Sequence, residues 1–401
     1  MRKFDTNFKK SSQEQLNSLL EYYQAGRYED TEKLSLSITQ EFPKNQFAWK
    51  VLGAALKQMG KLNESLVVCQ KSVELGTQDA EAHNNLGVVM KELGRLKEAE
   101  VSYRQAIILK SKYTEAHYNL GITLQEMGKL DKAEVSYRQA IKLKPDYAEA
   151  YNNLGGLLIK LNKLEEAKTC FKKAVEFKPD YAEAKHLFLA LTGQTTNSSP
   201  RKYVENLFDN YAINFEHSLL NKLEYKTPNL ITELIVAKNP KIQLGSVLDL
   251  GCGTGLIGDK IKKYCSNLDG VDLSKPMLEK ASAKNIYDKL QHKDIAEYLL
   301  TENLDFNYFI SSDVFVYVGE LSKIFQLIKS RNKSKGKFVF STEHTDRDGF
   351  FLEKSGRYSH SKKYIEGLCE KFGFKLSHFE TINLRKNKGK FIVGGLYLLD
   401  F

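Results

Sequence analysis

A glycine or asparagine recurs every 34 residues in the first half of the chain, and this period limits the possible folds more than any other feature. The recurring positions are Gly26, Gly60, Gly94, Gly128 and Asn162. A second glycine series precedes it by seven residues, at Gly53, Gly87, Gly121 and Gly155. Such a period predicts stacked helix-turn-helix units that bury their apolar faces against one another. We therefore expect an all-α superhelix of five repeats over residues 13–182.

Two helices of a hairpin pack closely only where small residues stand at the crossing and large ones fill the space beside it. Tyr103, Tyr137 and Phe171 are the large residues at one recurring position. With them, the segment AEAHNNLGVVMKELGRLKEAEVSYRQAIILKSKYT resembles the tetratricopeptide repeats. The resemblance implies a concave groove that binds an extended peptide or a partner domain. Because a solenoid must cover its last apolar face, we expect EAKHLFLALTG, residues 183–193, to form a capping helix.

The first helices of three successive repeats carry an asparagine in the triplet NLG, at Asn85, Asn119 and Asn153. An asparagine amide can accept from a peptide N–H and donate to a peptide C=O. A ladder of them would hold a polypeptide backbone without reading its sequence. In this the repeats resemble those of the protein O-GlcNAc transferases. The alternative is that these side chains satisfy helix ends within the repeat, and the second repeat has Val51 at this position.

The polar stretch GQTTNSSPRK, residues 193–202, has no periodicity, and we interpret it as a linker between a domain at 1–192 and another at 203–401. Beyond it, apolar runs alternate with helical segments, which is typical of an α/β domain with a parallel sheet. A basic turn, RKNKGK, joins the last two runs into a hairpin. We expect strands at 246–250, 268–272, 290–293, 307–311, 337–342, 376–384 and 391–400. This predicts a Rossmann-like sheet of seven strands with an antiparallel final strand, the arrangement of class I S-adenosylmethionine-dependent methyltransferases.

The loop in VLDLGCGTGLIGDK, residues 247–260, has a glycine spacing that fits two cofactors. Its last three glycines have the spacing of a dinucleotide-binding turn. Asp249, ahead of the glycines, favours the other reading, because a carboxylate repels a pyrophosphate and attracts the ammonium and sulfonium groups of S-adenosylmethionine. Asp272 ends the second expected strand, where it can accept the ribose hydroxyls, a feature that NAD-binding folds share. Asp294 follows the third strand, within reach of the adenine amino group, and only the combination separates the two cofactors.

This ordered set resembles the class I methyltransferases. The resemblance implies that S-adenosylmethionine is the cofactor. The residues that we expect at its site are Tyr211, Asp249, Gly251, Cys252, Gly253, Gly255, Asp272, Leu273, Met277, Asp294, Ile295 and Ser311.

The resemblance extends to the segments outside this core. PRKYVENLFDNYAINFEHSLLNKLEYKTPNLI and SGRYSHSKKYIEGLCEKFGF resemble a bacterial group of methyltransferases with N-terminal tetratricopeptide repeats. The resemblance implies that LFDNYAINF forms a helical lid over the cofactor. The residues of the lid that we then expect to line the site are Tyr203, Tyr211 and Phe215. The alternative is that these aromatic residues and Phe208 pack against the sheet.

Methyl transfer depends mainly on the alignment of the methyl donor with the acceptor, and it requires no nucleophilic residue of the enzyme. A base is needed only where the acceptor must lose a proton. Candidates to face the acceptor are Asp313 and Tyr317 after the fourth strand and Glu343 with His344, the preferred pair, after the fifth. The following loop adds Tyr358 and His360. The sequence SSDV after the fourth strand lacks the N-P-P-Y tetrad of methyltransferases that act on DNA bases or glutamine. No cluster has the spacing of metal ligands, so we expect no metal.

Composition supports an ordinary non-membrane protein. No segment approaches the roughly 18 apolar residues that span a bilayer, and five scattered cysteines indicate reduced thiols, so we expect a cytoplasmic protein. The net charge of +10 is spread over both halves. We interpret two basic clusters as solvated turns, and we do not expect a nucleic-acid partner. The clusters are Arg331, Lys333, Lys335 and Lys337, and Arg385, Lys386, Lys388 and Lys390.

Three hypotheses remain for the whole chain. The first is a methyltransferase whose repeats bring a protein or peptide substrate to the site. In the second, the acceptor is a small molecule or a glycan and the repeats only place the enzyme in a complex. In the third, the protein is an interaction scaffold whose cofactor site is vestigial, which the intact set of aspartates and glycines argues against.

Overall fold

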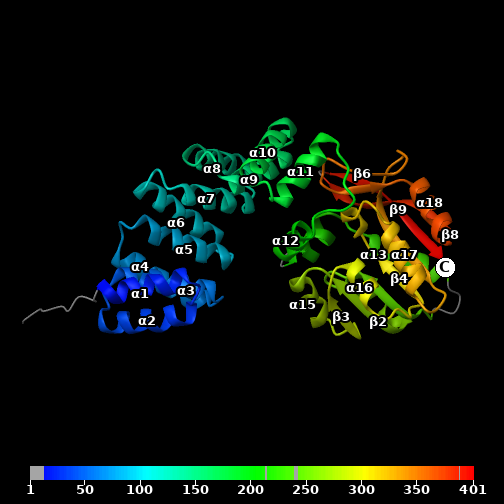
Figure 1. Ribbon diagram of the computed structural model, residues 1–401, viewed down its shortest axis with the longest axis horizontal. Helices are drawn as coiled ribbons and strands as arrows, with labels where there is room; N and C mark the ends of the chain where they lie inside the picture. Colours follow the sequence, from blue (N-terminus) through cyan, green and yellow to red (C-terminus); the bar gives the residue numbers. More distant parts are fainter. Residues whose placement is uncertain (1–12, 213–214, 239–242, 388) are drawn as a thin grey trace, which may run out of the picture. The chain divides into compact units, whose positions relative to one another are not determined.

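The computed structural model describes residues 13–212, 215–238, 243–387 and 389–401. The chain divides between Pro179 and Asp180 into two compact units (Figure 1). Helix α11 (Ala182–Thr192), which we expected to cap the repeats, falls in the second unit. Within the described residues, no helix is long and apolar enough to cross a membrane.

The first unit consists of five consecutive pairs of antiparallel helices, so the predicted all-α repeat array is confirmed (Figure 1). The turn inside each pair lies at the first recurring position, where the glycines have φ between 72° and 75° and Asn162 has φ 62°. This left-handed conformation explains why glycine or asparagine recurs there. The helices are α1 (Gln13–Gln24), α2 (Tyr28–Glu41), α3 (Gln46–Gln58), α4 (Leu62–Leu75), α5 (Ala80–Glu92), α6 (Leu96–Leu109), α7 (Thr114–Glu126), α8 (Leu130–Leu143), α9 (Ala148–Lys160) and α10 (Leu164–Phe177).

The second glycine series marks the crossing of the two helices in a pair. A Cβ added to Gly87 would lie 2.8 Å from the ring of Tyr103, and one added to Gly121 would lie 2.7 Å from the ring of Tyr137. Both tyrosines are almost fully buried. The small residue therefore makes room for the large one, as the sequence pattern predicts.

The second unit is a mixed sheet with helices on both faces (Figure 1). Its further helices are α12 (Arg201–Tyr211), α13 (Thr227–Ala237), α14 (Leu256–Ile261), α15 (Lys275–Ala283), α16 (Ile295–Thr301), α17 (Ser322–Arg331) and α18 (Lys362–Phe372). Its strands are β1 (Gly245–Leu250), β2 (Cys265–Asp272), β3 (Lys289–His292), β4 (Tyr308–Ser311), β5 (Lys337–His344), β6 (Phe350–Leu352), β7 (Tyr358–His360), β8 (Lys375–Asn387) and β9 (Lys390–Asp400).

Strands β3, β2, β1, β4 and β5 lie side by side and run parallel. Strand β9 continues the sheet antiparallel to β5, and β8 forms a hairpin with β9. The predicted antiparallel final strand is thus present. The carboxyl ends of β1, β2 and β4 meet at one edge, which is where open α/β sheets place their ligands.

Over the described residues the sheet has nine strands, and the prediction of seven was wrong. The two additional strands, β6 and β7, are three residues each and pair with each other. Strand β7 also runs parallel to the end of β5, where Glu343 pairs with Ser359. Such short strands show no two-residue alternation in the sequence, so the β5–α18 connection looked like a loop.

The crossing glycines give a direct test of the repeat packing. Replacing Gly121 by alanine forces a Cβ into the Tyr137 ring, and we expect a loss of about 1–3 kcal/mol in the free energy of unfolding. Gly156, in the interior of α9, is the matched control, because a Cβ there meets nothing within 4 Å. Gly156→Ala is expected to be neutral or to stabilise by up to about 1 kcal/mol.

Urea unfolding followed by the fluorescence of Trp49 measures this difference, because the single tryptophan lies in α3 of the first unit. Equal stability of the two variants would contradict the packing described for the glycine series.

Candidate functional site

The loop after β1 is shaped by three glycines with positive φ, Gly251, Gly253 and Gly255. A Cβ on Gly251 would lie 2.5 Å from the side chain of Val314, so only glycine lets these segments approach. At Gly253 the nearest atom to such a Cβ is a ring carbon of Phe215, 3.9 Å away. The backbone at Gly253 is therefore open toward the space that Phe215 covers.

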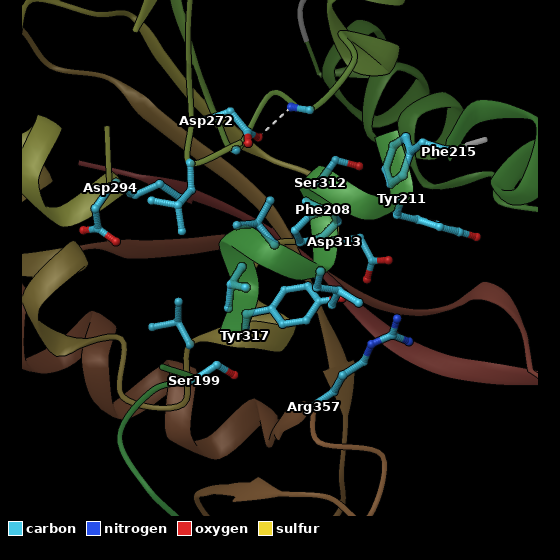
Figure 2. Close-up of a pocket in the computed structure, with 18 of the residues that line it drawn as sticks. Ser199, Phe208, Tyr211, Phe215, Asp272, Asp294, Ser312, Asp313, Tyr317 and Arg357 are labelled. Atoms are coloured by element: carbon cyan, nitrogen blue, oxygen red, sulfur yellow. Dashed lines mark hydrogen bonds between the residues drawn. The ribbon is translucent and has the colours of Figure 1, made fainter. Parts of the chain in front are cut away.

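Asp272, at the end of β2, accepts two backbone hydrogen bonds beside this loop. Its Oδ2 accepts from the N–H of Gly253 at 2.8 Å, the bond drawn in Figure 2, and its Oδ1 accepts from the N–H of Ser274 at 2.8 Å. Burial raises the pKa of the Asp272 carboxyl, although these bonds oppose the shift. The hydroxyl of Ser274, in the segment after β2, donates to Asp209 of α12 at 2.6 Å, which ties α12 to that segment.

A cavity of about 430 Å³ opens beside Asp272 (Figure 2). Helix α12 covers it with apolar side chains, including Phe208 and Tyr211. The ring of Phe208 packs edge-on against Tyr317, with 5.3 Å between centroids. Tyr211 and Phe215 line the cavity, whereas Tyr203 does not and packs against the ring of His186. That α12 forms a lid over a cofactor stays a prediction.

Nine of the predicted site residues line this cavity together. One group comes from the ends of β1 and β2, the segment after β3, and α12, and the other group follows β4. They are Tyr211, Gly251, Gly253, Asp272, Leu273, Asp294, Ile295, Asp313 and Tyr317.

The remaining predicted residues of the site lie outside the lining. Asp249 is fully buried on the far side of the loop, where its Oδ2 accepts from the hydroxyl of Tyr287 at 2.6 Å. Burial raises the pKa of its carboxyl to about 7, and its Oδ1 has no hydrogen-bond partner among the described residues. The side chain of Asp249 therefore does not face the cavity. The others outside the lining are Cys252, Gly255, Met277, Ser311, Glu343 and His344.

Glu343 and His344 do not act as a pair, because consecutive residues of a strand point to opposite faces of the sheet. The Glu343 carboxylate accepts from Arg385 at 2.5 Å, whereas the His344 ring lies 3.4 Å from Asp346. His360 is buried in β7, where its Nε2 contacts the carbonyl of Gly319 at 2.9 Å and burial lowers its pKa to about 4. These placements correct the prediction that Glu343 with His344 faces the acceptor.

The repeat asparagines lie on the first helices as expected, but they contact the preceding repeat. The Asn119 amide donates to Asn84 at 3.1 Å, and the Asn153 amide donates to the Tyr118 hydroxyl at 3.0 Å. Neither bond satisfies a helix end. The amide groups of these two residues thus link neighbouring repeats, and their role toward a bound peptide stays a prediction.

Family models match both units of the chain. A model described as "Methyltransferase domain" matches residues 247–336. "Tetratricopeptide repeat" matches 114–147 and 148–181, and "TPR repeat" matches 89–128. The chain carries tetratricopeptide repeats and a methyltransferase domain.

Solved structures similar to parts of the chain are of both kinds. MamA is 28% identical over 41% of this chain and 95% of its own, with a TM-score of 0.38. YrrB, described as a TPR protein with an unusual peptide-binding site, is 21% identical over 44% of this chain and 91% of its own, with a TM-score of 0.38. Magnesium protoporphyrin IX methyltransferase (ChlM) from Synechocystis PCC 6803, with bound SAH, is 15% identical over 50% of this chain and 98% of its own, with a TM-score of 0.40. No curated protein matches the chain.

Two arginines of the methyltransferase domain line the cavity and were missed as site residues. Arg385 belongs to the cluster that we interpreted as a solvated turn, yet it is 2% exposed and lies in β8. It forms ion pairs with Asp313 and with Glu343. Arg357 precedes β7 and points into the cavity near Tyr317 (Figure 2). Only the hydrophobic residues that precede Arg385 in a long strand, Ile382 and Leu384, could have indicated its burial.

Asp313 holds a backbone conformation that is rare for a residue with a side chain. Its φ is 60°, its N–H donates to the hydroxyl of Ser341 at 2.9 Å, and one carboxylate oxygen binds Arg385. Its other oxygen, Oδ1, is buried and has no hydrogen-bond partner among the described residues. Residues held in such conformations by their surroundings cluster at functional sites.

Arg385 and Lys386 are neighbours in the sequence and give a matched test of the buried ion pair. Arg385→Gln removes the guanidinium that hydrogen-bonds both Asp313 and Glu343, while Arg357 stays 3.8 Å from Glu343, and we expect the variant to destabilise the methyltransferase domain by about 3–5 kcal/mol. Lys386→Gln removes an exposed pair with Glu224 and is expected to cost less than about 1 kcal/mol.

Differential scanning calorimetry resolves this comparison, because only the transition of the second unit is expected to move. Similar small shifts for both variants would mean that the buried ion pair does not support the domain.

Proposed function

We propose that this protein transfers a methyl group from S-adenosylmethionine to an acceptor bound in the cavity, and that its repeats recruit a protein or peptide. The observation that supports this most is the position of Asp272. Its carboxylate lies in the cavity lining and holds the open backbone of Gly253. The carboxylate oxygens of Asp272 can bind hydroxyl groups, and at Gly253 beside them a ligand can approach the main chain.

The chemistry of the lining suits this cofactor. Asp272 and Asp294 are the acidic groups at this end, and they disfavour a pyrophosphate and favour a cation that carries hydroxyl groups. Asp272 would accept the ribose hydroxyls, while Leu273 and Ile295 would contact the adenine and Asp294 its amino group. Tyr211 and Phe215 of the lid would cover the ligand. The open space at Gly253 is where a side chain would otherwise obstruct it.

The cofactor, when bound, supplies an electrophilic methyl group on a positively charged sulfur. The chain's own residues have to orient the acceptor and exclude water. Phe208, packed against Tyr317, and Tyr211, packed against Phe215 at 5.7 Å between centroids, form the apolar cover. No nucleophilic side chain is required.

Asp313 and Tyr317 are the residues that we propose to face the acceptor. Asp313 Oδ1 is a buried oxygen without a partner among the described residues, so it is suited to accept a hydrogen bond from an acceptor N–H or O–H. The other oxygen of this carboxylate, Oδ2, accepts a hydrogen bond from Arg385, which fixes the direction of the carboxylate. Whether Asp313 also takes a proton depends on the acceptor.

For the repeats we propose a polypeptide partner in the concave groove, with Asn85, Asn119 and Asn153 along it. The amide contacts of Asn119 and Asn153 leave their Oδ1 atoms as acceptors for a peptide N–H. We place the protein in the cytoplasm, which agrees with five cysteines that are all free. The alternatives are a small-molecule or glycan acceptor and a scaffold with a vestigial site.

Asp272→Asn tests the cofactor site. The neutral amide offers one acceptor oxygen in place of two, and we expect the affinity for S-adenosylhomocysteine to fall about tenfold to a hundredfold. Asp269→Asn, three residues earlier in β2, is the matched control, since Asp269 bonds Asn267 and does not line the cavity. Titration calorimetry measures both, with the melting temperature as a check on folding. Unchanged binding in folded Asp272→Asn would place the cofactor elsewhere.

Radiolabelled methyl transfer in a cell lysate separates the acceptor hypotheses. If the repeats deliver a protein substrate, the label enters protein. The double variant Asn119→Ala with Asn153→Ala then reduces the labelling of protein several-fold, while its affinity for S-adenosylhomocysteine is unchanged. Label confined to small molecules or glycans would discard the protein acceptor. Cofactor binding without any transfer would favour the scaffold.

A further inference from the structure

The far end of the cavity, away from the glycine loop, carries an arginine whose charge is not matched by a carboxylate of its own. Arg357 is one-third exposed and its guanidinium points into the space beside Asp313 and Tyr317, across the cavity from Asp272 (Figure 2). It lies in the turn between β6 and β7, the part of the sheet that the strand prediction did not contain.

Four cationic side chains line the cavity, and three of them have a carboxylate within hydrogen-bond distance. Arg201 lies 3.3 Å from Glu297, Lys293 lies 2.7 Å from Glu302, and Arg385 lies 2.5 Å from Glu343. The four cationic residues of the lining are Arg201, Lys293, Arg357 and Arg385.

Arg357 differs from the other three. The carboxylate oxygen nearest to it in the described part of the chain is Glu343 Oε1, at 3.8 Å from its Nη1, which is beyond hydrogen-bond distance. That same oxygen already accepts from Arg385. A guanidinium has five N–H donors in a planar fork that matches a carboxylate or phosphate. The guanidinium lies 5.8 Å from the centroid of the Tyr317 ring and also hydrogen-bonds the Tyr317 side chain, and it lines the cavity.

The backbone that carries Arg357 is held firmly. Arg357 and Glu353 are joined by a backbone bond of 2.8 Å, and Gly356 between them has φ 78°. The carbonyl of Gly356 contacts Nε2 of the buried His186 of α11 at 2.9 Å. A guanidinium on such a turn loses little freedom when it binds a ligand.

We propose that Arg357 binds an oxyanion of the methyl acceptor, a carboxylate or a phosphate, so that the acceptor is an acid. This rests on the proposed function, because the acceptor shares the cavity with the cofactor. The charges at this end of the cavity agree: Arg357 and Arg385 balance the carboxylates of Asp313 and Glu343, so a bound anion meets no net negative charge. Asp313 Oδ1 then receives an N–H or O–H of the same molecule.

The test uses the full chain saturated with S-adenosylhomocysteine, at constant ionic strength. Sodium succinate, sodium benzoate and inorganic phosphate are titrated and their dissociation constants are read from thermal shifts, with succinamide and benzamide as uncharged counterparts. We expect at least one anion to bind more tightly than its amide or, for phosphate, than chloride. Phosphate binding without carboxylate binding identifies a phosphate ester, and the reverse identifies a carboxylic acid.

Arg357→Gln is expected to weaken that anion about tenfold or more, with Arg357→Lys in between. Arg331→Gln, an exposed arginine at the end of α17 outside the cavity, is expected to leave it within twofold. Unchanged affinity for S-adenosylhomocysteine in Arg357→Gln shows that the variant is folded.

The proposal is overturned if no anion binds better than its control, or if Arg357→Gln binds it as the wild type does. Failure of S-adenosylhomocysteine to bind the wild type would instead overturn the proposed function, and the anion titration of the free protein would still report on Arg357.

Discussion

The buried guanidinium of Arg385 is the interaction on which one end of the methyltransferase domain depends. It reaches from β8 to Asp313 after β4 and to Glu343 at the end of β5, so three separate parts of the chain meet at one charge. Taking charges out of water costs several kcal/mol for each ion, and only close pairing offsets this. The pairing fixes the carboxylate of Asp313, whose backbone has φ 60°, in the wall of the cavity.

The segment between the repeats and the α/β domain is part of the cavity wall and not only a spacer. The N–H of Ser199 donates to the carbonyl of Tyr317 at 3.0 Å, and the hydroxyl of Thr196 contacts that of Tyr358. His186 of α11 contacts both Ser199 and the turn that carries Arg357. A helix that resembles a repeat cap therefore supports the site, which explains why the compact second unit begins at Asp180.

Much of the fold could be predicted because its signals are local and periodic. The 34-residue spacing requires a left-handed turn and a helix crossing in each unit, and both need glycine for steric reasons. The positions of β1 to β5 and of the final hairpin follow from apolar runs. The site was harder, since burial and pairing are decided by distant residues. Asp249 was placed correctly beside the loop, but strand alternation turns its side chain toward Tyr287 and away from the cavity. Arg385 belongs to a run of basic residues of the kind that is usually exposed. No local sequence pattern indicates that it pairs with Asp313 and Glu343.

The central claim is that the cavity beside Asp272 is a site for S-adenosylmethionine and not for a dinucleotide, although the glycine spacing fits both. Titration calorimetry of the full chain with S-adenosylmethionine and, separately, with NAD tests it most directly. The account predicts binding of one S-adenosylmethionine per chain and no heat of binding with NAD. Binding of NAD without binding of S-adenosylmethionine would contradict it.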